Sequence, residues 1–260
     1  MITAGLDIGH QSIKGVLLDN RKILGHMTLQ LAEEVDCAAK VAFKELLLRA
    51  KMRPGQIDRL FATGVEREKV SIAHGHRTEM SCHLRGAHWF FPAVRTVIDT
   101  GAEGIRILRG DGEGNLAHFA LNDRCAAGTG IFLETVAIMM RIPLAEMGPL
   151  SLRSSREIFL TSTCAVFGES EIVGQIHRGA LREDILRAVH ESVASKIAFL
   201  TRRIGIEPEV ILTGGVARNQ GVVDALMRNL GVKIRVPENP EIAGALGAAI
   251  LAQNSAGAKR

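Results

Sequence analysis

Two cysteines stand in similar local sequences that could hold a metal cluster. Cys125 precedes the small-residue turn Ala126–Gly130, and Cys164 follows Ser162 and Thr163. Each leads into apolar residues at helical spacing, so we predict that each lies at the entrance to a helix. There a thiolate meets unpaired backbone N–H groups and the positive end of the helix dipole. An iron–sulfur cluster usually takes four thiolates, so a twofold dimer that brings two cysteines from each subunit would complete such a site.

A glycine-containing turn near the N-terminus is a second candidate for chemistry. The apolar segment Ile2–Leu6 runs into the sequence D-I-G-H-Q-S-I-K-G, and Val16–Leu18 returns, which predicts strand, turn and strand. A Rossmann or Walker loop would open a helix, so here the turn itself must hold the ligand. Asp7 at the strand end is placed to hold a metal ion through water, and Ser12 or Lys14 could meet phosphate oxygens.

The same arrangement recurs later in the chain. Thr96–Asp99 is an apolar strand that enters the glycine turn Asp99–Gly104, and Ile105–Leu108 follows as a strand. Such an internal repeat predicts two similar lobes that face a common cleft. A third glycine turn, Thr213–Asn219, follows the buried strand Val210–Leu212.

Apolar periodicity predicts the helices and strands that position these turns. Besides the segments after the two cysteines, helices are predicted over Val35–Lys51, Glu66–Ala73, Glu183–Arg203, Gly221–Leu230 and Glu241–Gln253, and strands over Ile57–Thr63, Leu116–Leu121 and Lys233–Val236. In the segment after Cys164, the helical positions are marked by Ile172, Val173 and Ile176.

Two of these helices carry residues with an expected role. In the first helix we expect Val41 and Leu46 on one buried face and Cys37 in the core. The last helix is rich in Ala and Gly, and Gly244 and Gly247 share one of its sides. Small residues there allow the close approach of a backbone or a ligand.

Composition narrows the class of protein. The 260 residues are 47% apolar with a net charge of +4, which predicts a packed core and gives no reason to expect nucleic acid as a partner. Four scattered cysteines do not form a disulfide framework. The chain shows neither a signal peptide nor a run of about 18 apolar residues, so we expect a cytoplasmic protein without a membrane span.

A histidine-rich stretch precedes the second glycine turn. It contains His74, His76, His83 and His88. We expect these histidines on the surface or where the lobes join, and Cys82 as a structural residue, because the spacing matches no zinc pattern.

The ordered set of glycine turns resembles the actin-like and sugar-kinase-like ATPase superfamily. The resemblance implies a two-lobed α/β fold, actin-like or ribonuclease H-like, with the nucleotide cleft between the lobes. One lobe would comprise 1–95 with the C-terminal helix 241–254, and the other 96–240. The first two turns would be phosphate loops and the third the adenosine loop.

This resemblance implies ATP or ADP with Mg²⁺ as ligands and assigns roles to residues of the turns. The catalytic residues would be Asp7, Asp99 and Glu103. The residues that contact nucleotide would be Gly9, His10, Gln11, Ser12, Lys14, Gly101, Ala102, Gly214, Gly215, Val216, Asn219 and Gly244.

The cysteine segments narrow the resemblance further. They resemble those of the ATP-dependent activators of 2-hydroxyacyl-CoA dehydratases and of the ATPase subunits of benzoyl-CoA reductase, over nearly the whole chain. This implies a dimer, of the chain with itself or with a sister ATPase subunit, and one bridging 4Fe–4S cluster held by Cys125 and Cys164. ATP turnover would push electrons from a ferredoxin or flavodoxin to the catalytic component of an acyl-CoA reductase or dehydratase.

The second loop departs from the activators. They carry D-x-G-G-Q-D-x-K, whereas this chain reads D-T-G-A-E-G-I-R from Asp99 to Arg106, with Glu103 as the nearest polar substitute. That loop resembles the smaller ATPase subunit of benzoyl-CoA reductase more closely. Two other functions stay open, a sugar-type or acetate-type small-molecule kinase and a regulatory subunit that binds nucleotide without hydrolysing it.

Overall fold

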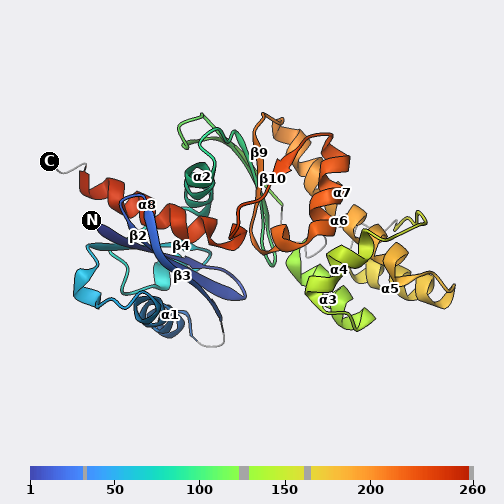
Figure 1. Cartoon of the computed structure of the whole chain (residues 1–260), viewed down its shortest axis with the longest axis horizontal. Coiled ribbons are helices and arrows are strands. Elements are labelled where there is room, and N and C mark those ends of the chain that lie inside the picture. The colour runs from blue at the N-terminus through green and yellow to red at the C-terminus, as the bar shows by residue number, and fades with distance from the viewer. Residues whose placement is uncertain (32–33, 123–128, 161–164, 258–260) are drawn as a thin grey trace. The chain divides into compact units, whose positions relative to one another are not determined.

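The computed structural model describes residues 1–31, 34–122, 129–160 and 165–257. The chain separates into two compact units (Figure 1). Unit 1 comprises Met1–Val97, Leu108–His118 and Pro237–Arg260, and unit 2 comprises Ile98–Ile107 and Phe119–Val236. Within the described residues the strands form two five-stranded sheets, so the predicted mixed α/β class is confirmed.

The sheet of unit 1 has the order β3-β2-β1-β4-β5. Its strands are β1 (Ile2–Ile8), β2 (Ser12–Asp19), β3 (Lys22–Gln30), β4 (Arg59–Gly64) and β5 (Gly75–His76). β1 is antiparallel to β2 and parallel to β4, which confirms the predicted hairpin. The apolar pattern did not predict β3, and of its residues Met27 alone is buried, so no apolar alternation marks it.

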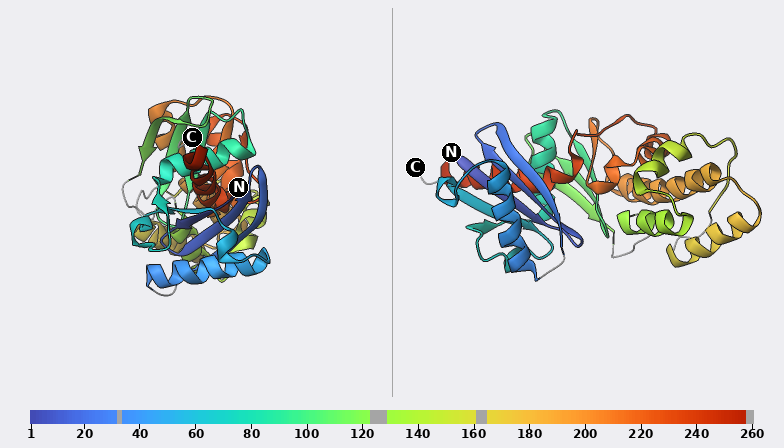
Figure 2. Two further views of the ribbon diagram at one scale, coloured as in Figure 1. Left: turned by 90° about the vertical axis from the view of Figure 1, so that its left-hand side faces the viewer. Right: turned by 60° about the horizontal axis from the view of Figure 1, so that its bottom comes forward.

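Two helices cover opposite faces of this sheet (Figures 1 and 2). α1 (Val35–Arg49) packs its Leu46 into a cluster with Leu6 and Ile13. α8 (Ala243–Gly257) packs against the other face, where Val16 and Leu18 meet its apolar residues. β1 and β2 are therefore buried on both faces, which explains their nearly continuous apolar sequences.

α8 approaches its neighbours closely because its contacts involve glycine. A Cβ atom on Gly247 would lie 1.8 Å from the carbonyl oxygen of Cys82, and one on Gly86 would lie 2.0 Å from that of Ala243. Cys82 and Gly86 belong to α2 (Glu79–Phe90), which begins after its N-cap Thr78. The close approach predicted for the small residues of the last helix is confirmed.

The second sheet has the order β10-β9-β6-β7-β8, and the boundary between the units passes through β6, β7 and β8. Its strands are β6 (Thr96–Thr100), β7 (Ile105–Gly110), β8 (Leu116–Leu121), β9 (Val210–Thr213) and β10 (Ile234–Arg235). The predicted second strand–turn–strand unit is present.

Unit 2 also contains most of the helices of the second half of the chain. They are α3 (Gly130–Met140), α4 (Leu144–Ser151), α5 (Ala165–His177), α6 (Arg182–Ile204) and α7 (Gln220–Leu230). α4 packs against both α6 and α7 in Figure 1. Their buried faces join β6, β7 and β9 in one large hydrophobic cluster.

Several expectations about individual residues are wrong. Val41 is 47% exposed and Cys37 is exposed, because both lie on the solvent side of α1. In α5, Ile172 is buried, whereas Val173 and Ile176 are exposed. The apolar pattern at these positions therefore does not report burial in this unit.

Other errors concern elements of structure. The predicted helix at Glu66–Ala73 is only a short 3₁₀ turn, Arg67–Lys69, and α2 and α4 were not predicted. α2 begins within the histidine-rich stretch, and Pro149 lies inside α4, so neither presents a clear helical signal. None of the helices in the described ranges is long and apolar enough to cross a membrane.

Candidate functional site

The first glycine turn joins β1 to β2 and places the predicted phosphate-loop residues together. Asp7 is buried at the end of β1, opposite Lys14 on β2 and Thr63 on β4. The turn is closed by the Gly9 N–H, which donates to the Ser12 carbonyl at 3.0 Å. The Lys14 ammonium lies 3.4 Å from the same carbonyl oxygen, so its charge is held over the turn.

The tip of this turn is open to solvent. His10 is exposed, and Gln11 and Ser12 are partly exposed. The Gln11 carbonyl accepts the N–H of Leu31, which ties the turn to the chain beyond β3. The hairpin thus carries a buried carboxylate at its base and polar side chains at its tip, a geometry suited to a hydrated metal ion and phosphate.

Gly244 reaches the same place from the far end of the chain. It lies in the first turn of α8, and a Cβ atom there would sit 2.4 Å from Asp7 Oδ2 and 2.9 Å from His83 Nε2. The structure thus brings two of the predicted site residues, Asp7 and Gly244, into contact. His83 completes the cluster, and its burial corrects our expectation of a surface or lobe-joining histidine.

In unit 2, Asp99 lies at the end of β6 and is held by two side chains. Arg106 Nη1 donates to Asp99 Oδ2 at 3.0 Å, and Thr213 Oγ1 donates to Asp99 Oδ1 at 3.0 Å. Because the Asp99 side chain is only 2% exposed and that of Arg106 15%, this ion pair is buried. Thr213 begins the predicted adenosine loop, so the second and third glycine turns meet at Asp99.

The glycines of the third turn have different surroundings. Gly214 has a φ of +86°, and a Cβ atom there would lie 2.3 Å from the Thr100 carbonyl oxygen, so only glycine fits. A Cβ atom on Gly215 would meet no described atom within 4 Å. The backbone at Gly215 is therefore open to the approach of a ligand, whereas Val216 is buried.

The second glycine turn supports the start of α3. Its own ends are joined by the Gly101 N–H, which donates to the Gly104 carbonyl at 3.0 Å. The N–H groups of Gly130 and Ile131 donate to the carbonyls of Gly101 and Ala102 at 2.9 and 3.1 Å. The predicted second phosphate loop, which includes the partly exposed Glu103, is thus bonded to the helix that follows Cys125.

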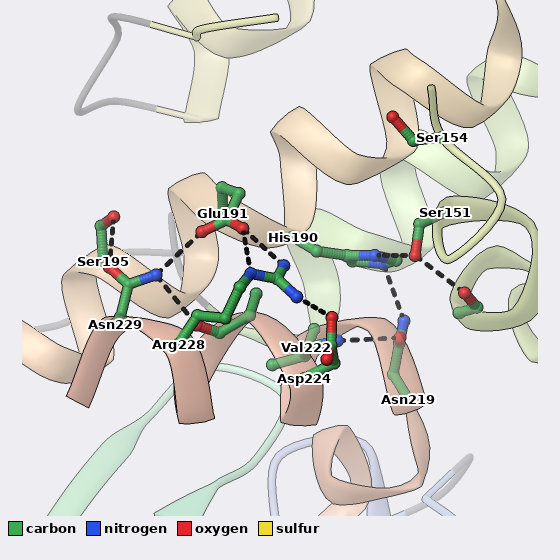
Figure 3. A network of polar contacts seen from close by, with 12 residues as sticks. Ser151, Ser154, His190, Glu191, Ser195, Asn219, Val222, Asp224, Arg228 and Asn229 are labelled. Carbon is green, nitrogen blue, oxygen red and sulfur yellow. Dashed lines mark hydrogen bonds and ion pairs between the residues drawn. The ribbon is translucent and has the colours of Figure 1, made fainter. Parts of the chain in front are cut away.

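Asn219 ends the third turn, and its side-chain hydrogen bonds are directed into the protein (Figure 3). Its Oδ1 accepts the N–H groups of Gly221 and Val222 and so caps α7. Its Nδ2 lies 3.1 Å from His190 Nε2. These side-chain contacts anchor the turn to α7 and α6.

His190 connects the third turn to α4. Because Asn219 Nδ2 can only donate, His190 Nε2 accepts, and its Nδ1 carries the proton that is donated to Ser151 Oγ at 2.9 Å. Ser151 in turn donates to the Gly148 carbonyl. Burial lowers the pKa of His190 to about 4, so the ring is neutral and the chain of donors is complete.

The two candidate cluster ligands, Cys125 and Cys164, lie outside the described residues. α3 begins at Gly130 and α5 at Ala165, so helices do follow both segments. Burial raises the pKa of the Cys82 thiol to about 12, which makes it a poor thiolate ligand. No group of three His, Cys, Asp or Glu residues that could hold a metal ion occurs within the described ranges.

A model of the BadF/BadG/BcrA/BcrD ATPase family matches residues 4–252. The chain belongs to this family. It is thus an ATPase, and the predicted resemblance is confirmed.

Solved structures extend the match of this family member to the fold. An activator of 2-hydroxyisocaproyl-CoA dehydratase from Clostridium difficile, with bound ADPNP, superposes with a TM-score of 0.94 at 37% identity, over 100% of this chain and 97% of that one. Component A of (R)-2-hydroxyglutaryl-CoA dehydratase from Acidaminococcus fermentans gives a TM-score of 0.95 at 35% identity, over 99% of each chain. The predicted actin-like ATPase fold is confirmed.

The family also includes a reductase component. A benzoyl-CoA reductase polypeptide from Thauera aromatica is 33% identical over 96% of this chain and 92% of its own. This identity is slightly below that to the two activators. The altered second loop by itself therefore does not place this ATPase in the reductase branch of the family.

Proposed function

We propose that this ATPase is an electron-transfer subunit, which uses ATP to deliver low-potential electrons to an acyl-CoA dehydratase or reductase. The observation that carries the proposal is the end-to-end similarity to two dehydratase activators, one of them solved with an ATP analogue. The electrons would come from a ferredoxin or flavodoxin. The acceptor would be a separate catalytic component.

For the nucleotide, we propose that unit 1 contributes Asp7 and the hairpin tip, and that unit 2 contributes Asp99 and the open backbone at Gly215. Hydrolysis of ATP depends mainly on positioning and on neutralising phosphate charge. Buried carboxylates at strand ends can hold Mg²⁺ through water, because magnesium retains most of its hydration shell. Arg106 and Thr213 keep the Asp99 carboxylate in one orientation.

The bonds between the second turn and α3 support a coupling of ATP to electron transfer. A change of nucleotide at Gly101 and Ala102 would act on the first turn of α3 through the N–H groups of Gly130 and Ile131. Cys125 lies five residues before this helix. We propose that the segment carrying Cys125 responds to the state of the nucleotide through these bonds.

For the cluster, we propose Cys125 and Cys164 from each of two subunits as ligands of one 4Fe–4S centre, which would supply one-electron chemistry. The chemistry of the donor set supports this choice. Cys82 is a buried thiol with a raised pKa, and Cys37 is an exposed residue on α1 in unit 1. The two remaining cysteines stand before helices in unit 2, where helix N-termini stabilise negative charge.

The test is iron and sulfide analysis after anaerobic purification. We expect about four irons per dimer, since four thiolates hold one such cluster, and loss of iron in Cys125→Ser and in Cys164→Ser. Cys37→Ser is the matched control and should keep its iron. A dimer that stays free of iron after anaerobic reconstitution would overturn the electron-transfer proposal and leave a small-molecule kinase or a nucleotide-binding regulatory subunit to be tested.

A further inference from the structure

His83 is a buried ionisable residue to which the roles proposed for the glycine turns assign nothing. It lies on α2, and its Nε2 is 3.7 Å from Asp7 Oδ2. The side chains of His83 and Asp7 are only 7% and 8% exposed. Both belong to unit 1, so their contact depends only on the packing within that unit.

The packing of α2 on α8 determines where this histidine lies. The helices touch at Gly86 and Gly247, where any side chain would collide with a carbonyl of the opposite helix. His83 lies between these contacts, beside Gly244. A side chain at Gly244 would fill the space that the imidazole and the Asp7 carboxylate now share.

The equivalent carboxylate of unit 2 shows what such a neighbour can do. Both oxygens of Asp99 accept hydrogen bonds at 3.0 Å, from Arg106 and Thr213. At Asp7, the ring of His83 faces Oδ2 from a distance slightly beyond a direct hydrogen bond. Such a contact restricts rotation of the carboxylate while leaving the lone pairs of Oδ2 accessible to a ligand.

We propose that His83 is a positioning residue, which orients the Asp7 carboxylate toward the hydration shell of nucleotide-bound Mg²⁺. The inference rests on the proposed role of Asp7. Residues that orient a metal ligand from behind typically change metal affinity by about 10–100-fold when they are replaced. His83 acts through Asp7 and does not itself contact the nucleotide.

The experiment measures the dependence of full-length, anaerobically purified protein on Mg²⁺. ATPase rates are titrated with Mg²⁺, and binding of a fluorescent ATP analogue is measured with Mg²⁺ and with EDTA. We expect His83→Leu to raise the half-saturating Mg²⁺ concentration about 10-fold, with unchanged binding in EDTA. His83→Gln keeps a donor of similar size and should stay within about threefold of wild type.

The matched control is His88→Gln, on the same helix. The ring of His88 contacts the Gly112 carbonyl at 3.3 Å and has no role at Asp7. This variant should keep the wild-type Mg²⁺ curve. If His83→Leu fails to fold, His83→Asn decides the outcome, since it shortens the side chain and should raise the Mg²⁺ requirement.

Asp7→Asn separates the two levels of the proposal. If Asp7→Asn raises the Mg²⁺ requirement while the His83 variants leave it unchanged, the positioning role is wrong and the nucleotide site stands. If Asp7→Asn also leaves the requirement unchanged, the proposed role of Asp7 fails. Equal loss of binding in Mg²⁺ and in EDTA for His83→Leu would indicate a purely structural role and overturn the inference.

Discussion

At the scale of single residues, this ATPase uses buried polar groups to hold its glycine turns. Asp99 is fixed by a buried arginine and a threonine, and Asn219 by a neutral histidine. Such groups are costly to bury unless they are fully hydrogen-bonded. Their arrangement is therefore sensitive to protonation and to loss of one partner.

His190 makes stability dependent on pH. Its pKa is about 4 in the folded protein, lowered by burial from 6.5, so the unfolded chain binds more protons between these values. The contribution is fully present above pH 6.5 and is lost as the pH falls toward 4. At 1.36 kcal/mol per pKa unit, the free energy of unfolding should decrease by about 3 kcal/mol over this window.

Urea unfolding of wild type and His190→Gln at several pH values measures this loss. The variant should be less stable near neutral pH, and its stability should fall less steeply between pH 6.5 and 4. His118→Gln, on β8, serves as the control. Parallel curves for wild type and His190→Gln would contradict the role of His190.

At the scale of elements, the bond between the second glycine turn and α3 is the feature with most consequence for function. Gly130 is the first residue of α3, a position where proline is tolerated, and Thr129 before it is extended with φ −121° and ψ 176°. Gly130→Pro therefore removes the N–H that donates to the Gly101 carbonyl while keeping the helix.

We expect Gly130→Pro to weaken the effect of nucleotide on the cluster. Loss of one hydrogen bond is worth about 1 kcal/mol, which corresponds to about 40 mV for one electron. The ATP-dependent shift of the reduction potential should shrink by about this amount, as measured by anaerobic potentiometric titration. Arg182→Pro is the matched control, because it places proline at the first position of α6 after the extended residue Leu181. An unchanged shift in Gly130→Pro would mean that the coupling follows another route.

At the scale of the whole molecule, the proposed function is a coupling between ATP and an electron. Such couplings are typically about 1–3 kcal/mol, or about 40–130 mV for one electron. We expect the cluster potential to be more negative with an ATP analogue than with ADP, by an amount in this range. Cluster potentials that are identical with the two nucleotides would contradict the proposal.

Much of this architecture was predictable because it is written in local patterns. Alternating or continuous apolar runs located β1, β2, β4 and β9, and helical spacing located α1 and α6. The order of the glycine turns led to the ATPase fold, which the solved relatives confirm. These signals are local since strand and helix periods are properties of consecutive residues.

The contacts that build the half-sites were not predictable in this way. Asp7, His83 and Gly244 meet only because α2 and α8 pack through glycines. The ion pair of Asp99 with Arg106 requires β6 and β7 to place their side chains together, and Asn219 finds His190 only through the packing of α7 on α6. The sequence by itself determined the elements, the turns and the family. Tertiary structure alone decided which distant polar groups share a buried space, because that depends on how closely two backbones can approach.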